Sequence, residues 1–82
     1  MIIFYVRHDV NGRTVYSFTT NSAYAQKFAK DVNGALYWAI NTFAIGVLIE
    51  EYQAYWINED YTESLIDNYK TNPFSLWELP TL

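Results

Sequence analysis

The sequence predicts a small α+β domain, and three observations lead to this fold class. Two segments rich in β-branched and aromatic residues flank Asn11-Gly12, which predicts an antiparallel hairpin over about residues 2–9 and 13–20. The next segment, about 22–33, carries apolar residues at helical spacing. Aromatic side chains make up 20% of the chain, and such rings supply the buried area that one small domain over residues 1–82 needs.

The register of the hairpin depends on the length of its loop. A three-residue loop, Val10-Asn11-Gly12, places Phe4 opposite Phe18, whereas a two-residue turn pairs Phe4 with Thr19. We predict the three-residue loop, because it brings the apolar and aromatic side chains together on one buried face.

The helix expected at about 22–33 has clear ends and two distinct faces. Its apolar residues recur at the i, i+3, i+4 and i+7 positions of one face, namely Ala25, Phe28, Ala29 and Val32. Asn21 belongs to a run of residues that favour the N-cap, and Asn33-Gly34 is a typical C-terminal stop.

Residues 35–57 fit two secondary structures. Residues 35–43 are compatible with a helix or a strand. The spacing of Ile45, Leu48 and Ile49 suits a helix, whereas the density of β-branched and aromatic residues suits a strand. We predict a further strand at about 46–57, with a helix as the alternative, because a third strand would give the hairpin and its helix a larger sheet.

A short acidic helix is predicted at about 60–70. Asp60 and Glu63 have the spacing of a capping box. Tyr61, Leu65 and Tyr69 recur every four residues and would form its packing face, opposite the carboxylates. The remaining residues form an extended C-terminal tail with an apolar character, which would dock on the domain or support a homodimer.

Composition restricts the class of protein. The chain has a net charge of −4 and no cysteine, which excludes disulfides, thiolate chemistry and the common structural zinc sites. We interpret the uncharged run over 32–49 as a buried element, because no basic residue flanks it as expected for a membrane span. The apolar start of the chain is too short for a signal peptide, so we expect a cytoplasmic protein.

No catalytic set, metal site or cofactor motif is expected. His8 is the only histidine, and we interpret it as a packed residue. The three glycines are isolated, so there is no phosphate-binding loop. The acidic segment lacks the spacing and the glycine of a calcium loop. We therefore expect that the protein is not an enzyme, and that it needs no cofactor or metal.

The sequence feature that best suggests a partner is a cluster of carboxylates interleaved with aromatic residues. The expected partner-binding residues are Glu50, Glu51, Tyr52, Tyr55, Trp56, Glu59, Asp60, Glu63 and Asp67. Carboxylates along an exposed face can imitate phosphates in front of a basic groove, and aromatic rings concentrate binding energy. A charged face that is only solvated is the alternative interpretation.

In size, acidity and lack of cysteine the chain resembles the small inhibitors that phages encode against host nucleic-acid machinery, including anti-CRISPR and other anti-defence proteins. The resemblance implies a stoichiometric inhibitor that uses its acidic aromatic face to bind the basic surface of a host nucleic-acid-binding protein. Direct nucleic-acid binding and membrane binding are not expected. Two alternatives stay open: a nucleic-acid-associated regulatory domain acting through Arg7, Lys27 and Lys30, and a self-associating structural module.

Overall fold

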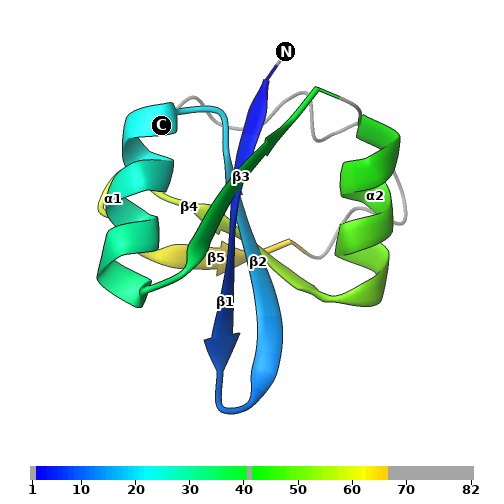
Figure 1. Cartoon of the computed structure of the whole chain (residues 1–82), viewed down its shortest axis with the longest axis horizontal. Helices are drawn as coiled ribbons and strands as arrows, with labels where there is room; N and C mark the ends of the chain where they lie inside the picture. The colour runs from blue at the N-terminus through cyan, green and yellow to red at the C-terminus, as the bar shows by residue number, and fades with distance from the viewer. Residues whose placement is uncertain (1, 41, 67–82) are drawn as a thin grey trace.

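The computed structural model, which describes residues 2–40 and 42–66, consists of a five-stranded mixed sheet with a helix on each side (Figure 1). The strand order is β3-β1-β2-β4-β5. In chain order the elements are β1 (Ile3–Val10), β2 (Arg13–Thr19), α1 (Ser22–Val32), β3 (Ala35–Ala39), α2 (Thr42–Glu51), β4 (Gln53–Ile57) and β5 (Glu63–Leu65). The predicted α+β class is confirmed.

Strand β1 lies inside the sheet and is antiparallel to both β2 and β3. Strand β2 is parallel to β4, and β4 is antiparallel to β5. Strands β3 and β5 are therefore the two edges of the described sheet, and they lie on opposite sides of the central hairpin.

The predicted hairpin is confirmed, but its predicted register is wrong. Asn11 and Gly12 both have positive φ, 52° and 80°, as a two-residue type I′ turn requires. Phe4 is therefore opposite Thr19 and not opposite Phe18. The prediction failed because it assumed a single buried face, whereas both faces of this sheet are covered by helices (Figure 1).

Two apolar clusters fill the space between the sheet and its helices. The cluster on the α1 side consists of Val6, Ala25, Phe28, Ala29 and Ile57. The cluster on the α2 side consists of Ile3, Tyr16, Phe18, Ile45, Ile49, Ala54 and Ile66. Alternate residues of one strand enter opposite clusters, because successive side chains of a strand point to opposite faces.

The predicted first helix is confirmed as α1, with both ends capped. The Asn21 side chain accepts hydrogen bonds from the backbone N–H groups of Ala23 (3.0 Å) and Tyr24 (3.2 Å). At the C-terminal end Asn33, the first residue of the predicted Asn33-Gly34 stop, adopts the left-handed conformation. Gly34 is needed for a close approach of the backbone. A Cβ at this position would lie 2.7 Å from Cγ1 of Val6, and because glycine has none, the chain that enters β3 can pass close to β1.

The ambiguous segment 35–57 divides into a strand, a helix and a strand. The strand predicted at 46–57 is correct for β4 and wrong for residues 46–51, which belong to α2. Ile45 and Ile49, one helical turn apart, are both buried against the sheet. Residues 46–51 form a helix because the second face of the sheet is apolar and must be buried by another element. The local spacing of apolar residues does not indicate this requirement.

The helix predicted at 60–70 is wrong over 60–66, where a turn leads into β5. Asp60 does accept a hydrogen bond from a backbone N–H, that of Thr62 (3.1 Å), but the bond closes a turn and starts no helix. Tyr61 has φ 65°, which interrupts any helix at this point. Residues 67–70 and the predicted C-terminal tail lie outside the described residues.

The described segments 2–40 and 42–66 contain two helices, α1 and α2. Neither helix is long and apolar enough to cross a membrane.

Candidate functional site

Four of the predicted partner-binding carboxylates lie exposed around β4. Glu50 and Glu51 end α2 just before β4, and Glu59 and Asp60 follow β4 in the turn to β5. We call these four residues the acidic flank. Because β4 is next to β5 in the strand order, the acidic flank belongs to the half of the sheet opposite β3.

Asp60 is held in its charged form by its turn. The hydroxyl of Thr62 donates a 2.6 Å hydrogen bond to Oδ1 of Asp60, and the Thr62 backbone N–H donates another to the same atom. These bonds lower the pKa of the Asp60 carboxyl, the side-chain bond having the larger effect. The Asp60 end of the acidic flank is therefore negative even in mildly acidic solution.

The predicted aromatic residues differ in their exposure. Tyr52, directly after Glu51, exposes 39% of its surface, and its ring lies 5.0 Å from that of Tyr16. Trp56 is half-buried on the α2 side, where it packs edge-on against Phe18. Tyr55 is half-buried on the α1 side. Tyr52 is thus the most accessible of the three rings.

Glu63 does not face outward with the acidic flank. It lies opposite Ile57 on the α1 side of the sheet, and only 26% of its side chain is exposed. Its Oε2 atom accepts a hydrogen bond from Oγ of Ser17 and lies 3.3 Å from Nε2 of His8. Asp67, the last predicted partner-binding residue, lies outside the described residues.

His8, Ser17 and Glu63 form a polar cluster inside the sheet face. Nε2 of His8 is 2.9 Å from Oγ of Ser17, and both residues are buried. In a nucleophilic triad, the serine and the carboxylate contact different nitrogens of the imidazole ring. Here both groups contact Nε2, and the Ser17 hydroxyl donates its hydrogen bond to the Glu63 carboxylate. The cluster is therefore not arranged to activate Ser17 as a nucleophile.

The sequence analysis did not find this cluster, because the predicted register placed Ser17 on the face opposite His8. The type I′ turn shifts the pairing by one residue and brings both side chains to the same face. The Asn-Gly dipeptide, which strongly favours a two-residue turn, was the signal that could have led to it.

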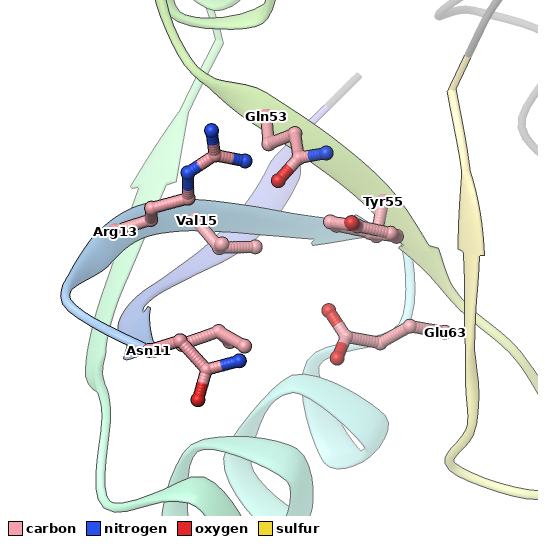
Figure 2. Close-up of a pocket in the computed structure, with 7 residues that line it drawn as sticks. Asn11, Arg13, Val15, Gln53, Tyr55 and Glu63 are labelled. Atoms are coloured by element: carbon pink, nitrogen blue, oxygen red, sulfur yellow. The ribbon is translucent and has the colours of Figure 1, made fainter.

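Beside the polar cluster the sheet surface is hollowed on its α1 side (Figure 2). The hollow has a volume of about 470 Å³ and is lined by Val10, Asn11, Arg13, Val15, Gln53, Tyr55 and Glu63. Arg13 and Glu63 lie on different sides of it (Figure 2). Small-molecule sites are mostly apolar and enclosed, whereas this hollow is partly open and is lined by polar and charged residues as well as apolar ones.

The other edge of the sheet carries an apolar surface that the sequence analysis did not find. Its members are the large exposed side chains of β3 and of the residues next to it, Ile2, Leu36, Tyr37, Trp38 and Ile40, which we call the apolar edge. Trp38 exposes 66% of its surface and Ile40 exposes 64%. The uncharged run over 32–49 was the sequence feature that corresponds to this apolar surface. We interpreted that run as an element buried in the core.

Arg7 and Lys27, two of the basic residues of the N-terminal half, lie on opposite sides of the sheet. Arg7 is on the α2 side of the sheet, with its guanidinium 5.9 Å from the ring centre of Tyr37. Lys27 is on α1, on the other side, where its ammonium pairs with Asp31 and lies 4.2 Å from the ring centre of Tyr61. Arg7 and Lys27 therefore do not belong to one basic surface.

Within the described residues, no group of three or more His, Cys, Asp or Glu side chains is placed to hold a metal ion. The comparisons with known proteins add no relative: no family model, no curated protein and no solved structure matches the chain.

Proposed function

We propose that the protein acts by stoichiometric binding to another protein, with the acidic flank facing a basic surface that binds nucleic acid. The observation that supports this proposal is the exposure of four carboxylates around β4. In the described part of the chain, the carboxylates that contact a basic side chain are Glu63, beside the His8 ring, and Asp31, paired with Lys27. The charge of the acidic flank is therefore available to a partner.

Electrostatics determines what this surface can do. Complementary charges raise the association rate and select the partner, and their effect falls with ionic strength. Hydrophobic contact would come from Tyr52, the residue between Glu51 and the start of β4 in the chain, which exposes 39% of its surface. Exposed aromatic residues next to charges are typical anchors of protein interfaces.

We infer an inhibitor of the kind that phages use against host defence, including anti-CRISPR proteins, because the chain resembles them in size, acidity and lack of cysteine. A partner that binds nucleic acid would be met in the cytoplasm. Occupation of its basic groove by carboxylates would exclude the nucleic acid.

The test compares neutralised variants of equal charge change. One variant carries Glu50→Gln and Glu51→Gln, and another carries Glu59→Gln and Asp60→Asn. Each is used to capture proteins from host lysate and then to measure association with the purified captured protein. We expect each pair to slow association, and the combined variant to slow it about tenfold or more at low salt. Wild-type protein should also displace nucleic acid from the captured protein.

The matched control carries Asp9→Asn and Asp31→Asn, which removes the same two charges from exposed positions outside the acidic flank. Circular dichroism establishes that each variant is folded. If the control slows association as much as the acidic-flank variants, net charge and not this surface determines binding. If the captured protein keeps its nucleic acid when it binds the wild type, the mimicry proposal is wrong.

A further inference from the structure

Strand β3 is an edge strand without the protection that edge strands usually have. Natural edges are short, charged, interrupted by proline, or covered, because their free N–H and C=O groups can pair with another strand. Residues 35–39 contain no charge and no proline. The other edge, β5, is only three residues long.

Among the described residues β3 pairs only with β1, and the apolar edge surrounds the outer row of β3 backbone groups. Leu36 and Trp38 lie on the α1 side of β3, because they are opposite Val6 and Phe4 of β1. Tyr37 lies on the α2 side, stacked on Tyr5 with ring centres 5.3 Å apart. A strand added at this edge would thus gain apolar contacts on both faces of the sheet as well as backbone hydrogen bonds.

We propose that the occupant of the apolar edge is β3 of a second copy of this chain. The two β3 strands would run antiparallel about a two-fold axis perpendicular to the sheet. The two five-stranded sheets would then join into one continuous sheet. Such a contact is isologous, since the same residues are used on both copies, and it closes at two chains.

The sequence of β3 suits this pairing. The register that pairs all five residues places Tyr37 at the two-fold axis, opposite Tyr37 of the second copy. Trp38 is then opposite Leu36 of the second copy, and Leu36 is opposite its Trp38. Aromatic–aliphatic cross-strand pairs of this kind stabilise antiparallel sheets. No charged pair is opposed, because the strand carries no charge.

The five residues of the apolar edge carry no charge, so they offer no ion pair to an acidic or basic partner and do not repel a second copy. Each chain has a net charge of −4, so two copies repel one another at most orientations. The acidic flank belongs to the opposite half of the sheet from β3. Pairing through β3 therefore holds the most acidic parts of the two copies far apart.

The available area indicates a dimer of moderate strength. A large aromatic side chain buries roughly 150–250 Å² when fully covered. With Trp38 and Ile40 about two-thirds exposed and the other three side chains less so, the apolar edge offers on the order of 400–500 Å² per copy. The total for two copies approaches the roughly 1,000–1,200 Å² at the lower end of specific interfaces, so the dimer should dissociate on dilution.

The first experiment measures the mass of the full chain by light scattering and sedimentation over a range of concentrations. We expect twice the 9.6 kDa chain mass at high concentration and the single mass on dilution. Trp38→Lys should keep the protein monomeric throughout. The matched control is Leu65→Lys, which places the same charge at an exposed leucine of the opposite edge and should leave the dimer intact.

The second experiment tests the register without weakening the apolar edge at Trp38. The chain has no cysteine, so a single Tyr37→Cys substitution allows only an intermolecular disulfide. In the proposed register the two thiols face one another at a distance that a disulfide can span. We expect rapid cross-linking on mild oxidation, and much slower cross-linking for Ser64→Cys on β5, which is also an exposed position.

Several outcomes would overturn the proposal. They are a wild-type chain that is monomeric at all concentrations, loss of the dimer in Leu65→Lys but not in Trp38→Lys, and equal cross-linking at both positions. A monomer that dimerises only after removal of residues 67–82 would show that this segment, and not a second copy, covers the apolar edge. The charge variants of the acidic flank test the proposed function independently, since they leave β3 unchanged.

Discussion

Removal of the Ser17 hydroxyl is the change that most directly tests the polar cluster inside the sheet. Oγ of Ser17 contacts two groups, Nε2 of His8 and Oε2 of Glu63. A hydrogen bond to a charged group contributes about 1.5–3 kcal/mol to stability, and one between neutral groups about 0.5–1.5 kcal/mol. Ser17→Ala loses one or two such bonds at a fully buried position.

The expected loss is smaller than the sum of these contributions. Glu63 is partly exposed and recovers water, and His8 keeps Glu63 as a neighbour at 3.3 Å. We therefore expect Ser17→Ala to lower the free energy of unfolding by about 2 kcal/mol. For a domain of this size that corresponds to a fall in Tm of roughly 8–16 °C.

The assay is thermal and urea unfolding followed by circular dichroism, on Ser17→Ala, Glu63→Gln and the double variant. Because the two side chains are in contact, their effects should deviate from additivity by roughly 0.5–3 kcal/mol. Ser64→Ala is the matched control, since its hydroxyl bonds Asn58 at an exposed position, and it should change stability by less than about 0.5 kcal/mol. Equal effects of Ser17→Ala and Ser64→Ala, or strict additivity with Glu63→Gln, would refute the cluster.

Two further predictions concern the turn regions. Gly34→Ala should cost roughly 1–3 kcal/mol of stability, because the new Cβ would lie 2.7 Å from Cγ1 of Val6 and 2.9 Å from the carbonyl oxygen of Arg7; an unchanged Tm in thermal unfolding would contradict this close approach. Thr62→Val should raise the pKa of Asp60 toward its ordinary value, since the side-chain hydrogen bond that lowers it most is lost. A lowered pKa stabilises the fold above the ordinary carboxyl pKa, and the benefit disappears as the pH falls through the lowered value, so the variant should be less stable at neutral pH and equally stable in strong acid. NMR titration of the Asp60 carboxyl carbon measures the shift, and identical titration curves would contradict it.

The elements that could be predicted from the sequence are those with strong local signals. The hairpin follows from Asn11-Gly12 between two apolar segments, and α1 follows from its cap at Asn21 and its regular apolar face. The errors arose where distant parts of the chain decide the outcome. The register depends on a second covered face, which α2 supplies, and the segment 60–66 joins the sheet because β4 offers it an edge.

Some features of the candidate site could be predicted from the sequence, and others could not. The exposure of Glu50, Glu51, Glu59 and Asp60 agrees with the ordinary preference of carboxylates for solvent. The inward orientation of Glu63 depends on Ser17, which is distant in the sequence and was assigned to the wrong face. The exposure of Trp38 was not predicted, because the uncharged run that contains it was interpreted as a buried element.

The parallel pairing of β2 with β4 has a consequence for the order in which the chain folds. The β1–β2 hairpin closes across two residues, whereas Val15 meets Gln53 only after α1, β3 and α2 have been placed between them. Closing a longer segment costs more chain entropy before any contact is made, and such contacts slow folding. We expect substitutions in the hairpin to change the refolding rate, and Ala54→Gly in β4 to change mainly the unfolding rate. Stopped-flow refolding of the two kinds of variant would reveal whether the sheet grows outward from its central pair.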